Sequence, residues 1–335
     1  MRGSPGHAKP RAPPNRPADV SPSAKLLAGV ELGGTKCVCI LGTGPDDVRA
    51  VERLPTGERE ETLRQIEAVL DRWRTQFGAL RALGIASFGP VDLRIDSPTY
   101  GFITSTTKPQ WRNTDVVQRL RHRLGVPTGF DTDVNGAALA EGRWGAARGL
   151  DDFAYVTVGT GIGVGTIVRG RSVFGMNHTE LGHIRVARRP GDTFPGVCSF
   201  HGDCIEGLAS GPAIEARAGM PASQLPPEHP AWDFVAHGLG QLMHAMVLTT
   251  APARIFLGGG VMSAQAHLFE RIQQELKRSL NRYVEAPQLE EGLAQFIVPP
   301  GLGTMSGPLG ALALAADADV PAAAIKPPAA TASLR

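Results

Sequence analysis

The chain has 335 residues and a mass of 35.4 kDa, and its 42% hydrophobic and 20% charged residues are typical of globular proteins, which excludes wholesale disorder. No uncharged apolar run reaches the roughly 18–20 residues of a membrane-spanning helix, and the first residues lack the apolar core of a secretory signal, so we expect a cytoplasmic protein with no membrane partner. The net charge of +2 comes from the first 25 residues, which carry five basic side chains and one acidic one; the rest is mildly acidic, and we expect no nucleic-acid partner.

The first 25 residues include six prolines and predict a disordered tail. Two apolar runs then flank Gly33-Gly34-Thr35-Lys36 and predict a β-hairpin. Apolar residues at spacings of 3 and 4 over residues 63–77 predict a helix. The following runs predict a strand over 81–88, a helix over 116–124, a strand over 127–130 and a helix over 134–144. This alternation predicts an α/β lobe over residues 26–133.

A second α/β lobe is expected over residues 134–305. Two strand-like runs flank Gly159-Thr160-Gly161, so a hairpin with a glycine-rich turn occurs once in each lobe. The later runs predict a helix over 232–248, a strand over 254–257, a helix over 264–281, a strand over 296–298 and a helix over 306–316. We expect the last helix to pack on the first lobe and the Ala/Pro-rich residues 317–335 to form a loose tail.

The glycine turns of the two hairpins are candidate anion sites. Backbone N–H groups that point into such a turn bind phosphate, and glycine lets the phosphate approach closely. Neither turn has the Walker spacing or a GxGxxG between strand and helix, which excludes a P-loop NTPase and argues against a dinucleotide site. A single turn could simply make a tight hairpin. Two such turns, with a third glycine cluster at residues 258–260 that opens a helix, favour a nucleotide clamp between the lobes.

Two aspartates, Asp131 and Asp133, lie at the junction of a predicted strand and a helix N-terminus. Phosphoryl transfer to a hydroxyl needs a carboxylate within hydrogen-bond reach of the attacking oxygen, and Asp133 is the candidate. Either aspartate could instead be a helix cap, which is a common structural role for aspartate at such a junction.

Two of the four cysteines have metal-ligand spacing. Cys198, His201 and Cys204 form a Cys-x₂-His-x₂-Cys pattern, with His183 fifteen residues upstream. This set meets the demands of tetrahedral zinc, although unpaired thiols beside a loop histidine are the alternative. Four protein ligands leave no open position, so the zinc would be structural. Cys37 and Cys39 alternate with apolar residues in a strand-like run and are expected to be buried reduced thiols.

Six motifs, in order, resemble those of the ROK family of sugar kinases, and specifically its bacterial fructokinase branch. They are GVELGGTK, FDTDVNGAALAE, VTVGTGIGVG, HTELGH, CSFHGDCIEGLASGPA and FLGGGVM, between about Leu26 and Ala316. The resemblance implies the two-lobed actin-like ATPase fold, related to ribonuclease H, with a zinc-binding loop. It also implies phosphorylation of D-fructose to D-fructose 6-phosphate by ATP, with Mg²⁺ and structural Zn²⁺, in an enzyme that is commonly a homodimer.

The resemblance also implies roles for individual residues. Asp133 matches the family's catalytic base and Asn135 a helper in the sugar pocket, while Glu31 is interpreted as a carboxylate that reaches magnesium through water. The residues implied to bind the sugar are Gly89, Lys108, Asn135, Glu180 and His183, with residues 104–108 along the opposite wall. The residues implied to bind ATP are Gly33, Gly34, Thr35, Lys36, Gly159, Thr160 and Gly161, with Pro212, Gly258, Gly259, Gly260, Val261 and Met262 near the adenine. Residues His183, Cys198, His201 and Cys204 match the family's zinc ligands, and Thr179 and Ser199 replace prolines usual in this branch.

Other functions remain possible at this point. The form of the zinc loop favours the fructokinase branch, but a kinase for mannose, glucose or an N-acetylated amino sugar, or a catalytically silent sugar-binding regulator, would share the same motifs. A sugar-responsive repressor of this family needs a winged-helix domain ahead of the kinase-like part. Residues 1–25, with six prolines, cannot form one, so we expect an enzyme.

Overall fold

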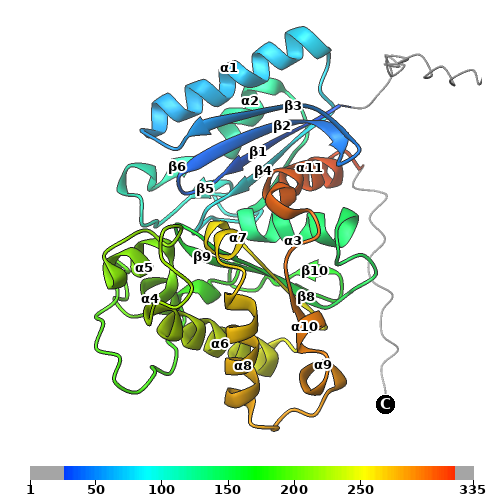
Figure 1. The fold of residues 1–335 in the computed structure, drawn as a ribbon. Coiled ribbons are helices and arrows are strands. Elements are labelled where there is room, and N and C mark those ends of the chain that lie inside the picture. Colours follow the sequence, from blue (N-terminus) through cyan, green and yellow to red (C-terminus); the bar gives the residue numbers. More distant parts are fainter. Residues whose placement is uncertain (1–25, 321–335) are drawn as a thin grey trace, which may run out of the picture.

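Two five-stranded sheets, one in each lobe, form the framework of the protein (Figure 1). The structure is a computed structural model and describes residues 26–320. The tail predicted over residues 1–25, and residues 321–335 of the second predicted tail, lie outside the described residues. Among the helices of residues 26–320, none combines the length and apolarity that a membrane crossing requires.

The sheet of the first lobe has the strand order β3-β2-β1-β4-β7. Its strands are β1 (Leu27–Leu32), β2 (Lys36–Gly44), β3 (Asp47–Pro55), β4 (Ala82–Ser87) and β7 (Thr128–Thr132). The first three strands form an antiparallel meander, and β1, β4 and β7 are parallel. Helices α1 (Arg59–Phe77) and α2 (Val117–Leu124) cover the outer face of this sheet (Figure 1), where Leu63, Ile66 and Trp73 of α1 enter the core.

The sheet of the second lobe repeats this order. Its strands are β8 (Phe153–Val158), β9 (Ile162–Val168), β10 (Arg171–Ser172), β11 (Ile255–Gly258) and β12 (Ile297–Val298), arranged β10-β9-β8-β11-β12. In both lobes, the third strand lies at one edge, the second and first follow, and the two later strands add on in parallel. Helices α6 (Ala231–Thr249) and α8 (Leu268–Leu280) cover the outer face, and their apolar residues form the largest core cluster.

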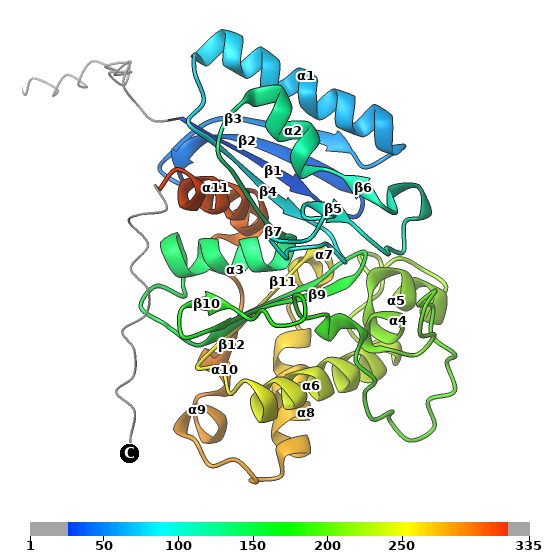
Figure 2. The ribbon, with the colours of Figure 1, turned by 180° about the vertical axis from the view of Figure 1, so that it is seen from behind.

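Helices α3 (Asp133–Trp144) and α11 (Ser306–Ala318) lie between the two sheets (Figure 2). Each follows the last strand of a sheet, so the two helices occupy equivalent places in the repeat. They cross where Gly136 meets Gly310: a methyl group placed on Gly310 would lie only 2.3 Å from the carbonyl carbon of Gly136. The two glycines therefore allow the inner helices, and with them the lobes, to approach closely.

The remaining elements are short and connect this framework. In the first lobe they are β5 (Phe102–Ile103), η1 (Pro109–Trp111) and β6 (Thr114–Asp115). In the second lobe they are η2 (Leu181–His183), α4 (Ile205–Ala209), α5 (Gly211–Ala218), α7 (Gly260–Ala264), α9 (Pro287–Glu290) and α10 (Leu293–Phe296), with η3 (Gly303–Met305) leading to α11.

The predicted two-lobed α/β fold is confirmed, and several individual elements differ from the predictions. Strand β3 was not predicted, and neither were α4 and α5. The helix predicted over residues 264–281 begins later, as α8 at Leu268, because the backbone leaves the helical path at Gln265 after the separate short helix α7. The last helix extends to Ala318, so Asp317 and Ala318 belong to α11 and not to a loose tail; Asp317 pairs with Arg143 of α3.

Candidate active site

A cleft of about 750 Å³ lies between the lobes, with walls from both sheets. The first lobe contributes residues at the ends of β1, β4 and β7 and the segment 105–108, and the second lobe contributes the β8–β9 turn and the segment 178–206. The predicted site residues that line the cleft are Gly33, Gly34, Thr35, Lys36, Gly89, Lys108, Asp133, Gly159, Thr160, Gly161, Glu180, His183, His201 and Gly260, together with Glu31.

The two glycine turns face each other across the cleft. The turn between β1 and β2 and the turn between β8 and β9 approach so closely that the hydroxyl oxygens of Thr35 and Thr160 are 2.6 Å apart. Each turn closes on itself with a backbone hydrogen bond, 3.1 Å from Gly33 N to Lys36 O in the first and 2.9 Å from Gly159 N to Gly161 O in the second. The two turns bring threonine hydroxyls and glycine main chain from both lobes to one point of the cleft, which is the arrangement expected of a polyphosphate site.

Asp133 is the first residue of α3, and its carboxyl group faces the cleft. The helix cap is Thr132, whose hydroxyl accepts a hydrogen bond from Asn135 N at 3.1 Å. One carboxylate oxygen of Asp133 accepts from Val134 N at 2.9 Å. Burial, with a smaller contribution from the charge of nearby Asp131, raises the pKa of Asp133 to about 6. Asp133 is thus a half-buried carboxylate of raised basicity that the helix does not need as a cap.

Asp131 and Asn135 serve each other instead. Asn135 Nδ2 donates to Asp131 Oδ1 at 2.7 Å, and the same oxygen accepts from Thr132 N at 2.7 Å. Asn135 is buried and is not among the residues that line the cleft. The side chain of Asn135 therefore stabilises the β7–α3 junction. It does not line the cleft itself, and it can affect a sugar there only by positioning the junction that carries Asp133.

Two glutamates flank Asp133 across the cleft. Burial raises the pKa of Glu31, on β1, to about 7, and the negative charge of Asp133 adds to the shift. Burial likewise raises the pKa of Glu180 to about 7, followed by the charges of Asp133 and Glu206. These carboxyl groups lie close enough to oppose each other's ionisation, which is typical of a site that holds a cation or hydroxyl groups.

The wall at Glu180 depends on the absence of a side chain at Gly89. A methyl group there would lie 2.7 Å from Glu180 Oε1 and 3.3 Å from the His178 ring. His178 Nε2 accepts a hydrogen bond from Val91 N at 3.0 Å, and burial lowers its pKa, so the ring is neutral and joins the lobes. Lys108 lies on the same side of the cleft, and a methyl group on Gly34 would lie 3.9 Å from its Cε atom.

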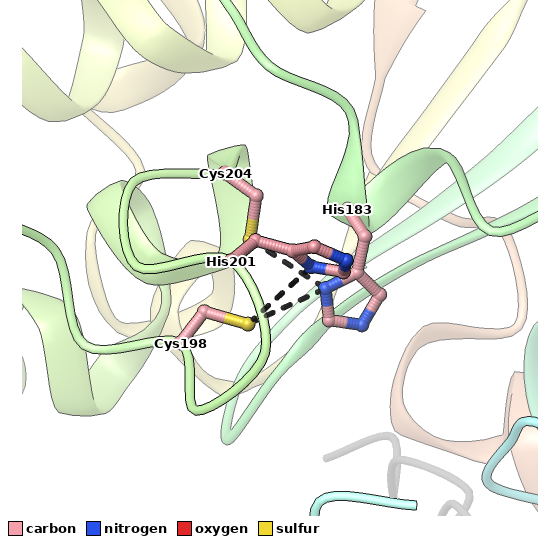
Figure 3. A group of neighbouring side chains, drawn as sticks. All are labelled: His183, Cys198, His201 and Cys204. Carbon is pink, nitrogen blue, oxygen red and sulfur yellow. Dashed lines mark hydrogen bonds between the residues drawn. The ribbon is translucent and has the colours of Figure 1, made fainter. Parts of the chain in front are cut away.

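Four side chains of the second lobe converge as a candidate metal centre (Figure 3). The ligand atoms of His183, Cys198, His201 and Cys204 all lie within 4.8 Å of one another. His183 Nδ1 is 3.7 Å from Cys198 Sγ and 3.5 Å from Cys204 Sγ, and His201 Nδ1 is 3.7 Å from Cys198 Sγ. In a tetrahedral zinc site, bond lengths of about 2.3 Å to sulfur and 2.0–2.1 Å to nitrogen separate the two by about 3.6 Å. The cluster therefore has the size and ligand chemistry of zinc.

Glu206 is a cleft residue that the sequence predictions missed. It follows Cys204 by two residues, and its Oε2 atom accepts a hydrogen bond from Ile162 N in the β8–β9 turn at 3.0 Å. Its other oxygen lies 3.9 Å from His183 Nε2, the nitrogen that faces away from the sulfurs. Glu206 thus links the candidate metal centre to the second glycine turn. The sequence signal that could have identified Glu206 is its position within the motif CSFHGDCIEGLASGPA.

Several residues predicted to surround the adenine do not line the cleft. Val261 and Met262 are buried in the core of the second lobe. Gly259 adopts a φ of 93° and packs its backbone against Val158. Pro212 lies in the first turn of α5, next to Gly211, whose N–H donates to Gly159 O at 2.7 Å. This region supports the second glycine turn from behind, with Gly260 as its exposed contact.

Residues 27–318 match the sequence profile described as the ROK family. A protein of Bacillus subtilis is 44% identical over 292 residues, which covers 87% of this chain and 95% of that protein. The fructokinase of Zymomonas mobilis is 40% identical and covers 88% of this chain and 98% of its own. The crystal structure of the ROK hexokinase from Thermus thermophilus is similar, with a TM-score of 0.70 and 27% identity over 87% of this chain and 98% of that chain.

Proposed function

Because this chain belongs to the ROK family, we propose that Asp133 is the general base of its reaction, the ATP-dependent phosphorylation of D-fructose to D-fructose 6-phosphate. The observation that supports this role is the environment of Asp133. Its carboxyl group faces the cleft, is not consumed as a helix cap, and has a pKa of about 6. Such a group is ionised at neutral pH yet basic enough to accept a proton in the transition state.

In this mechanism the residues of the two lobes have separate tasks. Asp133 accepts the proton of the 6-hydroxyl as that oxygen attacks the γ-phosphorus of ATP, and ADP leaves with the bridging oxygen. The N–H groups of the two glycine turns bind the phosphates, with Lys36 and Lys108 as nearby cations. Glu180 orients sugar hydroxyls on the opposite wall, in the space that Gly89 leaves. The contacts between the lobes exclude water, which limits hydrolysis of ATP.

The magnesium site that we propose rests on Glu31. Mg²⁺, when bound with ATP, neutralises the charge on the phosphates and keeps most of its waters. Glu31 fits as its protein partner through water, because its carboxyl group lines the cleft beside the first glycine turn and is opposed by Asp133. A divalent cation would add countercharge to that of Lys36 and Arg53, which only partly offset the repulsion between these two carboxylates.

We also propose that His183, Cys198, His201 and Cys204 hold a structural zinc ion. The separations of 3.5–3.7 Å between sulfur and nitrogen atoms support this assignment, as does the two-cysteine, two-histidine donor set. His183 would offer Nδ1 to the metal and keep Nε2 toward Glu206 and the cleft. Its place in η2, directly after Glu180, would fix the backbone that carries the sugar ligand.

We propose that adenine lies against the second lobe beside Gly260, where the backbone of residues 258–262 and the loop at Pro212 lie behind the second glycine turn.

We propose a homodimer from the family resemblance alone, and light scattering should give twice the chain mass. Thiol ligands for zinc need a reducing compartment, which supports the cytoplasm.

The test of this function compares Asp133→Asn with Asp131→Asn. ADP release is measured in a coupled assay with fructose, mannose, glucose and N-acetylated amino sugars. Fructose should stimulate the wild-type protein most, and Asp133→Asn should lower kcat by about 10²–10⁴-fold while fructose still binds in calorimetry. Asp131→Asn alters the neighbouring carboxylate, which does not line the cleft, and should stay within about tenfold of the wild type. Near-normal turnover by Asp133→Asn would overturn the assignment of the base, and stimulation by a different sugar would overturn the substrate.

A further inference from the structure

An aromatic side chain of the candidate metal loop reaches across the cleft to the other lobe. Phe200 lies between Cys198 and His201, is 50% exposed and lines the cleft. The guanidinium carbon of Arg112, in the first lobe, lies 5.8 Å from the centre of its ring. This separation is within the range of a cation–π contact, which contributes modestly at an exposed site.

Besides the ring of Phe200, the guanidinium of Arg112 contacts the segment that forms one wall of the cleft. Its Nε atom donates to the carbonyl oxygen of Thr106 at 3.2 Å. Arg112 is exposed, and among residues 26–320 no carboxylate lies within ion-pair distance of its guanidinium. The ring of Phe200 and the carbonyl oxygen of Thr106 are therefore the groups with which the guanidinium interacts. The Thr106 hydroxyl in turn accepts from Lys108 N at 3.3 Å. Arg112 therefore holds the segment 105–108, which forms one wall of the cleft.

On its own side, Phe200 lies beside the two histidines of the candidate metal centre. Its ring centre lies 6.1 Å from that of His201, which is 5.1 Å from the ring of His183. The loop is further fixed by Asp203, which pairs with Arg185 and with Arg188. The metal loop thus positions Phe200. Phe200 in turn contacts Arg112, and Arg112 bonds to Thr106 in the segment 105–108.

We propose that Phe200 and Arg112 form a latch that closes the sugar end of the cleft and positions segment 105–108 over the bound sugar. The latch rests on the proposed sugar kinase function and adds two positioning residues to it. Neither residue touches the reacting atoms. Other contacts that join the lobes at the cleft are Thr35 with Thr160 and the Val91 main chain with His178 and Asn177. Because the latch lies at the sugar end, its loss should loosen sugar binding more than phosphate binding.

The test uses zinc-loaded protein and a double-mutant cycle of Phe200→Ala and Arg112→Ala. Each single variant should raise the KM for fructose by about two- to fivefold, the range expected from one exposed cation–π contact, with kcat and the KM for ATP changed less than about twofold. The double variant should be no worse than the more affected single variant. Phe200→Tyr, which keeps an aromatic face, should restore the wild-type KM, whereas Phe200→Leu should not. Phe174→Ala is the matched control, because Phe174 is 49% exposed on the same lobe and does not line the cleft.

Hydrogen exchange gives a readout that does not depend on the reaction. Without substrates, Phe200→Ala and Arg112→Ala should each speed amide exchange in residues 104–113, and Phe174→Ala should not. Unchanged exchange in that segment, or strictly additive effects on the fructose KM, would overturn the latch. If wild-type protein does not phosphorylate fructose at all, the proposed function fails, and the exchange measurement alone decides whether the latch exists.

Discussion

Three carboxyl groups on the cleft walls titrate near neutral pH. The pKa of Asp133 is about 6 and those of Glu31 and Glu180 are about 7, in each case chiefly because burial disfavours the charged form. Mutual repulsion among these groups adds to the effect. The cleft therefore carries charge that its surroundings solvate poorly, and ligands that supply a cation or hydroxyl donors relieve that cost.

This cost predicts that Glu31→Gln stabilises the protein in a pH-dependent way. The folded-state pKa of about 7 lies above the ordinary value, so the ionised group opposes folding as pH rises through the interval between the two, and the whole effect is present above pH 7. In magnesium-free buffer, the variant should raise Tm by about 2–4 °C at pH 8 and by less at pH 5. Thermal unfolding at both pH values is the measurement. An equal Tm change at the two pH values would contradict the burial argument, and exposed Glu290→Gln should change Tm at neither pH.

The distinction between Asp131 and Asp133 shows where single-residue prediction stops. Both aspartates lie at the strand–helix junction, so their positions alone permitted a cap or a base for either. In the structure the cap belongs to Thr132, between them, and Asp131 bonds to Asn135. Which side chain takes a cap depends on backbone angles at the junction, and these are set by the pairing of β7 with β4, far away in the sequence.

At the scale of elements, the glycine-turn hairpins were predictable and the polar elements were not. Each hairpin has apolar strands around glycines, and its local pattern is sufficient. Strand β3 lies at a sheet edge and is mostly half-exposed, so charged residues interrupt its pattern. The break between α7 and α8 depends on Gln265, whose amide donates to the carbonyl oxygens of Ala222 and Leu225. Those partners lie about 40 residues away, and no local signal shows them.

The metal loop yields the prediction at this scale. Cys204→Ser should lower bound zinc from about one ion per chain to a small fraction, because serine replaces a thiolate ligand. It should also lower Tm and raise the KM for fructose, since the loop carries Phe200 and adjoins Glu206. Elemental analysis of dialysed protein, followed by thermal unfolding, makes both measurements. Cys37→Ser is the control, because Cys37 is a buried thiol outside the cluster. Full zinc occupancy in Cys204→Ser would exclude this ligand.

At the scale of the whole molecule, the two segments that pass between the lobes meet at one buried carboxylate. Glu141, on α3, is fully buried and accepts four hydrogen bonds. The donors are Ala146 N, Gly301 N, Leu302 N and Ser306 Oγ, at 2.8–3.0 Å. The first of them follows α3, Gly301 and Leu302 lie between β12 and α11, and Ser306 is the first residue of α11. The Glu141 side chain therefore connects the segment after α3, where the chain leaves the first lobe, to the segment before and at the start of α11, where it returns.

These hydrogen bonds predict that Glu141→Gln weakens the coupling between the lobes, so that they unfold at different temperatures. At the Oε2 position the amide NH₂ would face two N–H donors, those of Ala146 and Gly301. At the Oε1 position it would face Leu302 N and the Ser306 hydroxyl, which can turn toward Gly303 O and accept instead, so either orientation leaves at least one buried N–H unsatisfied. The cost is about 1–3 kcal/mol for each buried group left unpaired, enough to lower Tm by about 5 °C or more. Scanning calorimetry should show one transition for the wild type and a broadened or split transition for the variant, with exposed Glu215→Gln as the unaffected control. A single transition at the wild-type Tm would mean that α3 and α11 hold the lobes together by their glycine crossing alone.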